Sequence, residues 1–151
     1  MEQLPDDIYA QIEALSEAGN DASDLGEHAD AIVHWRRALA LLPEPRREWE
    51  AYEWLQASIG DAHYQMGDYA QAKDCLFEAL NTLAAQENAF AHYMLGKAMW
   101  HLGEEPAFDR LMRAYMLEGA EIFETDPPEG PQMLAALRER GLLAGPGGPA
   151  A

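Results

Sequence analysis

The residues with catalytic or metal-binding chemistry are few and scattered. The five histidines form no metal-ligand pair such as His-Glu-x-x-His, and neither paired cysteines nor an Asp-rich calcium loop occurs. These histidines are His28, His34, His63, His92 and His101. The three serines, at positions 16, 23 and 58, stand outside any Gly-x-Ser-x-Gly motif. The sequence therefore predicts that the protein is not an enzyme and holds no metal or cofactor. One possibility stays open: a catalytic pair of carboxylates that come from positions far apart in the sequence.

The charge is strongly negative and unevenly distributed. Acidic residues number 27 against 10 basic ones, which gives a net charge of −17. This charge argues against nucleic acid or an anionic membrane as the ligand, and it favours a basic partner. The first basic residue is Arg36, whereas nine acidic residues precede it. Two interpretations of that acidic stretch remain open: a solvated surface that keeps the protein soluble, or a binding surface for cations.

The length and hydropathy suit one soluble domain. With 151 residues, 48% of them hydrophobic, the chain is long enough for a core of its own. No apolar run approaches the roughly 18 to 20 residues that span a bilayer, and the first residues lack the pattern of a signal peptide. We therefore expect a single domain over residues 1–144, a cytoplasmic location and no membrane partner.

Glycines recur in pairs that are seven residues apart. The pairs are Gly19 and Gly26, Gly60 and Gly67, and Gly96 and Gly103. Each pair is followed by an amphipathic stretch, at residues 31–42, 70–83 and 107–123. The first glycines are 41 and 36 residues apart, close to the period of about 34 residues of one class of helical repeat. A small residue at the first glycine lets two helices approach, and the second glycine ends a helix in a left-handed conformation. The pattern predicts a helix-turn-helix unit used three times.

The order of small and large side chains along these units resembles that of the tetratricopeptide family. The first unit matches with Leu15, Gly19, Gly26, Ala31, Trp35, Ala38 and Pro43. The second matches best, with Ile59, Gly60, Gly67, Asp68, Tyr69, Ala72, Leu76 and Ala79, and the third keeps Leu95, Gly96 and Gly103. The resemblance covers residues 12–122. It implies an all-α fold, an α-solenoid of three repeats that binds another protein.

The repeats are expected at about residues 12–45, 53–86 and 89–122. Their six helices are expected at residues 6–24, 28–42, 47–66, 69–85, 88–102 and 106–124. A capping helix is expected at 131–140, because Pro131 suits a first helical position and Gly141 can end the helix. Residues 145–151 are rich in Gly and Pro, so a disordered tail is expected there.

In the tetratricopeptide family the first helix of each unit lines a concave groove. The resemblance therefore implies partner-binding residues on those helices. They are Glu13, Asn20 and Asp24 in the first unit, Trp54, Asp61 and Tyr64 in the second, and Tyr93, Lys97 and Trp100 in the third. The four aromatic residues in this set fit a core position as well, and that alternative stays open. Six other aromatic residues are assigned to the core or to the contacts between helices: Trp35, Tyr69, Phe77, Phe108, Tyr115 and Phe123.

Residues 111–124, followed by Asp126 and Pro127, resemble the end of helical-repeat immunity proteins of bacterial polymorphic toxin systems. That resemblance implies a cytoplasmic inhibitor whose acidic groove neutralises a basic cognate toxin domain. The alternative is a general adaptor that binds a peptide or assembles a complex. Some proteins of this family clamp the carboxylate tail of a chaperone with a set of Lys, Arg and Asn side chains. An adaptor of this kind is disfavoured here, because only Asn20 and Lys97 among the inner positions suit such a clamp. The sequence does not give the oligomeric state.

Overall fold

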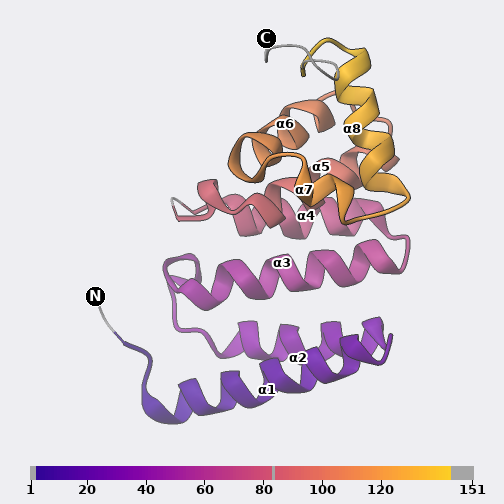
Figure 1. Cartoon of the computed structure of the whole chain (residues 1–151). Coiled ribbons are helices and arrows are strands. Elements are labelled where there is room, and N and C mark those ends of the chain that lie inside the picture. Colours follow the sequence, from indigo (N-terminus) through magenta and orange to yellow (C-terminus); the bar gives the residue numbers. More distant parts are fainter. Residues whose placement is uncertain (1–2, 83, 144–151) are drawn as a thin grey trace. The chain divides into compact units, whose positions relative to one another are not determined.

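The computed structural model describes residues 3–82 and 84–143, and this part of the chain is helical and contains no strand (Figure 1). The predicted all-α class is therefore confirmed. The α-helices are α1 (Asp6–Asp24), α2 (His28–Leu41), α3 (Glu50–Gln65), α4 (Tyr69–Leu80), α5 (Ala89–His101), α6 (Ala107–Glu118), α7 (Glu121–Glu124) and α8 (Glu129–Glu139). Two 3-10 helices, η1 (Arg46–Glu48) and η2 (Ala84–Glu87), lie in connections. None of the described helices is long and apolar enough to cross a membrane.

The chain forms two compact units that divide between Gln86 and Glu87. The first unit contains α1 to α4 with η1, and the second contains α5 to α8. Consecutive helices pair as hairpins: α1 packs on α2, α3 on α4 and α5 on α6. A single domain over residues 1–144 stays a prediction, and the predicted tail at 145–151 lies outside the described residues.

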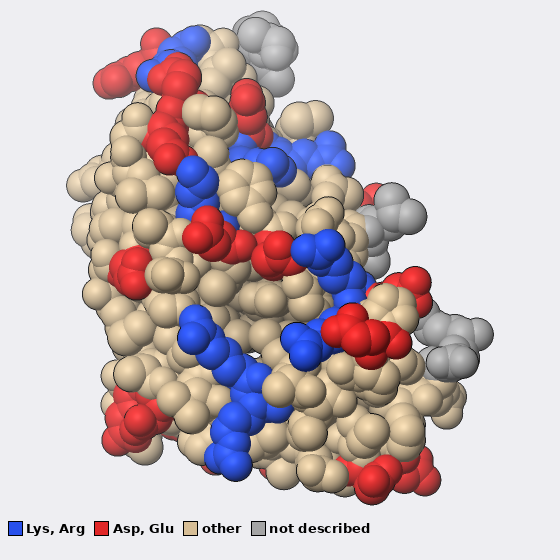
Figure 2. Space-filling model, turned by 180° about the vertical axis from the view of Figure 1, so that it is seen from behind, with Lys and Arg blue, Asp and Glu red and all other residues tan. Residues whose placement is uncertain are grey.

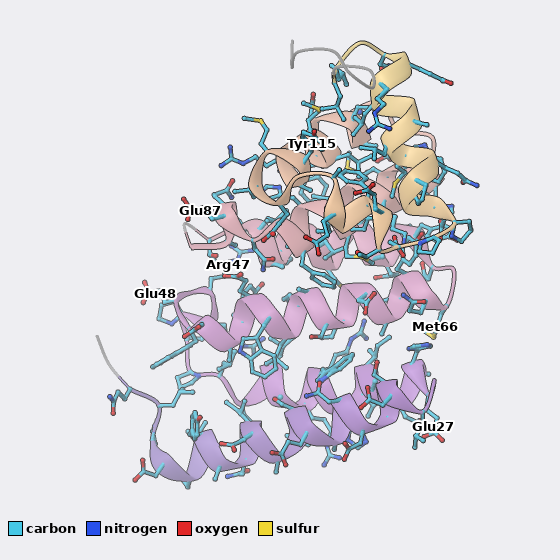
Figure 3. The ribbon with its side chains drawn as sticks, in the orientation of Figure 1. Glu27, Arg47, Glu48, Met66, Glu87 and Tyr115 are labelled. Atoms are coloured by element: carbon cyan, nitrogen blue, oxygen red, sulfur yellow. The ribbon has the colours of Figure 1, made fainter. Side chains whose placement is uncertain are left out.

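The glycine pairs have the two roles that the sequence predicts. Gly19, Gly60 and Gly96 lie where the first helix of each hairpin touches the second. A Cβ atom added there would lie 2.5 Å from Trp35 Cδ1, 2.7 Å from Leu76 Cγ and 2.8 Å from Leu111 Cγ, respectively. The second glycines all have a positive φ, between 72° and 78°, at the hairpin turns. In the first unit both turns lie at the same end, as the labels of Glu27 and Met66 show (Figure 3).

The boundaries of four helices differ from the prediction by two residues or more. α3 begins at Glu50 rather than at residue 47, because residues 46–48 form the 3-10 helix η1. α4 ends at Leu80 rather than at residue 85, because Thr82 Oγ1 accepts a bond from the Ala85 amide and a 3-10 turn follows. The predicted helix 106–124 is broken at Gly119, whose φ of 74° ends α6 before the short α7 begins. α8 begins at Glu129, two residues before the predicted start, and ends before Gly141, which has a φ of 73°.

The buried residues form a stripe on α1, α2 and α4, whereas α5 is buried on all sides over residues 91–99. Trp35 and Phe123 are buried, as predicted, whereas Tyr69, Phe108 and Tyr115 are only half-buried. The core assignment of Phe77 is wrong, because this side chain is 39% exposed. In α4 the core is formed by the stripe Ala72, Leu76, Ala79 and Leu80, and Phe77 lies one residue, about 100° of helix rotation, away from Leu76.

Candidate partner-binding surface

The predicted binding residues lie on one side of each first helix, which we call the inner side. It carries Glu13, Asn20 and Asp24 on α1, Trp54, Asp61 and Tyr64 on α3, and Tyr93, Lys97 and Trp100 on α5. The three helices share a register, because Asn20, Asp61 and Lys97 each follow a packing glycine. The surroundings of these residues nevertheless differ from helix to helix.

On α1 the inner side is exposed and acidic. Glu13, Asn20 and Asp24 are all exposed. The helix contains six acidic residues and no Lys or Arg, and α3 contains three acidic residues and again no Lys or Arg. The Lys and Arg side chains of the first unit that the structure describes lie on the other elements: Arg36 and Arg37 on α2, Arg46 and Arg47 on η1, and Lys73 on α4. The described Lys and Arg side chains of this unit are thus confined to α2, η1 and α4, which carry acidic residues as well.

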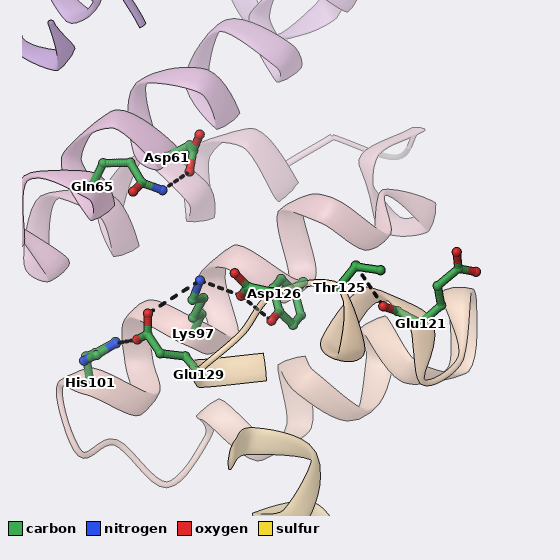
Figure 4. Close-up of polar contacts among 9 residues, drawn as sticks. Asp61, Gln65, Lys97, His101, Glu121, Thr125, Asp126 and Glu129 are labelled. Carbon is green, nitrogen blue, oxygen red and sulfur yellow. Dashed lines mark hydrogen bonds and ion pairs between the residues drawn. The ribbon is translucent and has the colours of Figure 1, made fainter. Parts of the chain in front are cut away.

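On α3 the inner side is less accessible. Trp54 is 39% exposed, and Asp61 is half-buried and accepts a hydrogen bond from Gln65 Nε2 at 3.2 Å (Figure 4). Tyr64 is buried, with its ring 5.2 Å from the ring of Tyr69 at an angle of 60°. Of the aromatic residues predicted for this helix, Trp54 is available to a partner in this structure, whereas Tyr64 packs inside the unit.

On α5 the inner side is covered by residues that follow α7. Tyr93 and Lys97 are both buried. The Tyr93 hydroxyl and the Lys97 ammonium each donate to Asp126 Oδ2, at 2.6 Å in both cases (Figure 4). Burial raises the pKa of Tyr93, and its hydrogen bond to the Asp126 carboxylate raises it further. The structure therefore brings these two predicted residues together, but in an internal contact that a partner does not reach.

The third predicted residue of α5, Trp100, is half-buried with its ring centroid 5.3 Å from that of His101. His101 Nε2 in turn contacts a carboxylate oxygen of Glu129. Asp126 and Glu129 are not among the residues predicted to bind a partner. The sequence around them, Asp-Pro-Pro-Glu-Gly at 126–130, predicts a loop, and such a pattern does not indicate which helix the loop contacts.

The opposite side of the first unit carries a second feature that the sequence did not indicate. Two adjoining cavities of about 350 and 250 Å³ share Leu39 and Gln56 in their walls. Their rims are charged, with Arg36, Arg46, Arg47, Glu44, Asp74 and Glu78. Figure 2 shows the molecule from behind, where Lys and Arg side chains are interleaved with acidic ones. This side thus has both signs of charge, unlike the inner side of α1 and α3.

Part of that charged rim is tied together internally. Arg47 donates three hydrogen bonds to the carboxylate of Glu78, at 3.2, 3.0 and 2.8 Å, and the Tyr52 hydroxyl donates to the same carboxylate at 2.5 Å. These donors, Tyr52 first and then Arg47, hold the pKa of Glu78 below its usual value. Burial and the hydrogen bond to Glu78 raise the pKa of Tyr52. Arg47, Tyr52 and Glu78 therefore form a connected polar network in this part of the rim.

The described residues contain no group of three or more His, Cys, Asp or Glu side chains that could hold a metal ion.

Comparison with known proteins identifies the fold. No protein-family model matches the chain, and no curated protein matches its sequence. Solved structures do match. The first tetratricopeptide (TPR) domain of Spaghetti (RPAP3), bound to the HSP90 peptide SRMEEVD, has a TM-score of 0.66 and 19% identity, covering 87% of this chain and 95% of that one. The chain has the tetratricopeptide fold.

Two further structures with this fold are similar. The second tetratricopeptide domain of human RPAP3, in complex with the HSP70 peptide SGPTIEEVD, has a TM-score of 0.67 and 18% identity, over 87% of this chain and 98% of that one. MamA has a TM-score of 0.65 and 21% identity, over 87% of this chain and 69% of that one. The predicted tetratricopeptide repeats are therefore confirmed at the level of the fold. These structures offer no counterpart for the resemblance to immunity proteins.

Proposed function

We propose that this protein is a protein-binding adaptor without catalytic activity, and that the inner sides of α1 and α3 hold a basic segment of a partner. One observation carries the proposal. The two helices that present these sides contain nine acidic residues and no Lys or Arg, whereas the cations described for the same unit lie on α2, η1 and α4. The absence of cations makes the surroundings of α1 and α3 negative, and Glu13, Asp24 and Asp61 bring three of these acids to the inner sides, where they would attract a cationic segment.

The comparisons support the adaptor more than the inhibitor. Two similar domains of this fold are described as bound to peptides of HSP90 and HSP70. Both peptides end in Glu-Glu-Val-Asp, and the acids of α1 and α3 would repel such an end. The ligand proposed here is therefore a peptide segment of the opposite charge. Trp54 is exposed on the same side and offers the apolar contact area that a stable complex needs.

A second candidate function is the neutralisation of a bacterial toxin in the cytoplasm. The net charge of −17 favours it, because an acidic inhibitor can cover the basic cleft of a toxin that attacks nucleic acids. Genomic context separates the two functions. A toxin gene directly upstream would favour the inhibitor, and a gene among assembly factors would favour the adaptor.

The proposed site can be tested with a fluorescein-labelled nona-lysine peptide and fluorescence anisotropy. The double substitution Glu13→Gln and Asp24→Asn removes two charges from the inner side of α1. The matched control, Glu118→Gln and Glu139→Gln, removes two charges from exposed positions of α6 and α8. We expect the first variant to bind at least about fivefold more weakly than the wild type, and the control to lose less than about twofold. Equal losses would show that only the net charge matters, and the proposed site would be rejected.

A further inference from the structure

A histidine occupies a position of the second hairpin that apolar residues occupy in the other two. His63 lies three residues after the packing glycine of α3, and the equivalent residues of α1 and α5 are Ala22 and Met99. All three are buried, with 8%, 7% and 4% of their surface exposed, respectively. A buried polar side chain is costly unless it has hydrogen-bond partners, so the contacts of His63 require an explanation.

His63 lies where three elements of the first unit meet. Its Nε2 atom is 3.4 Å from Nη2 of Arg36, on the neighbouring helix α2. Its Nδ1 atom is 3.7 Å from Oδ2 of Asp68, the residue that precedes α4. The other carboxylate oxygen of Asp68 accepts a hydrogen bond from the Gln71 amide, which holds this side chain at the start of α4. Arg36 and Asp68 are the charged groups that face His63 in the described part of the chain.

The contact with Arg36 determines where neutral His63 carries its proton. A guanidinium donates hydrogen bonds and accepts none, so Nε2 has to be the acceptor and the proton of the neutral ring is on Nδ1. At 3.7 Å this Nδ1–H group is too far from Asp68 for a hydrogen bond. Neutral His63 therefore joins α3 to α2, and its buried Nδ1 atom has no hydrogen-bond partner among the described residues.

A second proton on His63 changes both contacts. Nε2 then no longer accepts a hydrogen bond, and two positive charges face each other across the 3.4 Å to Arg36. On the other side of the ring, the positive charge attracts the Asp68 carboxylate, and an approach of less than about 1 Å gives a charge-assisted hydrogen bond. Protonation thus weakens a contact between the two hairpins and strengthens a contact within the second hairpin.

We propose that His63 is a pH-dependent switch between the two hairpins of the first unit: when neutral it holds Arg36 of α2, and when protonated it releases Arg36 and binds Asp68 instead. The apolar core that runs through both hairpins, with Trp35 and Ile59 among its residues, stays closed in either state. The switch therefore changes a polar link beside this core and leaves the fold intact. The inference does not depend on the proposed function, because it concerns the contact between α2 and α3.

The surroundings of His63 set the pH range of the switch. Burial lowers the pKa of His63 below its usual value of 6.5, while the charge of Asp68 opposes this effect and the charge of Arg36 adds to it. Because the folded-state pKa lies below the unfolded-state value, the folded protein has its full stability from this residue above about pH 6.5. It loses that stability as the pH falls from there through the folded-state pKa.

The test is an NMR titration of the histidine ring nitrogens in the full-length protein, between about pH 7.5 and pH 5. We expect the neutral ring of His63 to carry its proton on Nδ1 and to titrate with a midpoint below 6.5. The Nε–H signal of Arg36 should shift with the same midpoint, whereas that of Arg37, its exposed neighbour on α2, should not. A neutral ring protonated on Nε2, or an Arg36 signal that does not follow the titration, would overturn the proposal.

Three substitutions separate the switch from a general effect of charge. Arg36→Gln should raise the midpoint of His63, because it removes the cation that opposes protonation. Asp68→Asn should lower the midpoint, and it keeps the start of α4 because Asn also suits the N-cap position. The matched control, Arg37→Gln, removes the same charge from an exposed residue of α2 that does not face His63, so the midpoint should stay nearly unchanged. Equal effects of Arg36→Gln and Arg37→Gln would also overturn the proposal. Should a variant fail to fold, the titration of the wild type still decides.

Discussion

Gly19 lies directly against the indole ring of Trp35, so closely that a Cβ atom on Gly19 would lie 2.5 Å from Trp35 Cδ1. Trp35 is itself buried, with 4% of its surface exposed. A rigid ring enclosed in a core has little room to shift. This contact fixes how closely α1 and α2 approach, and with it the position of the acidic inner side of α1.

The substitution Gly19→Ala should therefore destabilise the protein. In a helix an alanine is ordinarily better than a glycine by roughly 0.5–1 kcal/mol, but overpacking a core costs about 1–3 kcal/mol. We expect a net loss of about 1–2 kcal/mol in the free energy of unfolding, measured by urea denaturation. The neighbouring exposed substitution Asn20→Ala should change it by less than about 0.5 kcal/mol. A Gly19→Ala variant as stable as the wild type would refute the close contact.

The two aromatic residues Trp35 and Phe77 should respond differently to truncation. Trp35→Ala empties a buried site and should lower the free energy of unfolding by roughly 3–5 kcal/mol. Phe77 is 39% exposed, so Phe77→Ala should cost less than about 1.5 kcal/mol. Denaturant titrations of both variants measure these changes in the free energy of unfolding. Similar losses for the two variants would show that Phe77 belongs to the core.

The stability of the first unit should depend on the protonation of Glu78. Hydrogen bonds from Tyr52 and Arg47 lower the folded-state pKa of Glu78 below the usual value of 4.5. A carboxylate with a lowered pKa stabilises the fold above its unfolded-state pKa, and this contribution is lost as the pH falls through the folded-state pKa. We expect stability to fall below about pH 4.5 more steeply in the wild type than in Glu78→Gln.

Thermal unfolding midpoints between about pH 3 and pH 6 measure this difference. The control is Glu48→Gln, at an exposed carboxylate next to Arg47 in the sequence (Figure 3). It should keep the wild-type pH dependence. If the Glu78→Gln and wild-type curves run parallel, the carboxylate of Glu78 does not contribute as the structure indicates.

Association with a basic segment should depend strongly on salt. The screening length falls from roughly 30 Å at 0.01 M to about 8 Å at 0.15 M ionic strength, which weakens the attraction between the acidic inner side and a distant cation. Stopped-flow measurements with nona-lysine should show an association rate that falls across this range by about tenfold or more. A rate that does not change would mean that the acids of α1 and α3 do not steer binding.

Much of the fold follows from short-range sequence signals. The paired glycines predict the three hairpins because each glycine is required by local geometry: the first by a close helix contact, the second by a positive φ at a turn. The bounds predicted for the first helix, residues 6–24, agree with α1. The end of α6 at Gly119 could not be predicted in this way. A lone glycine inside an apolar pattern is tolerated in many helices, and only the backbone conformation shows that this one ends the helix.

The environment of the predicted binding residues could not be read from the sequence in the same way. The resemblance to the tetratricopeptide family implies that Tyr93, Lys97 and Trp100 share one side of α5, and their spacing of four and three residues agrees with this. What covers that side comes from Asp126, 29 residues after Lys97, and no local pattern encodes such a contact. In α4, Phe77 and Leu76 are adjacent and both apolar, so the choice of which one faces the core depends on the helix it packs against.

A basic partner segment on the inner sides of α1 and α3 can be located by an NMR titration of the isotope-labelled protein with nona-lysine. We expect the largest amide shifts on these two helices, around Asn20, Trp54 and Asp61, and little shift of the amides near Arg36 and Lys73. Shifts that are largest on α2 and α4, or spread evenly over exposed acids throughout the chain, would contradict this placement.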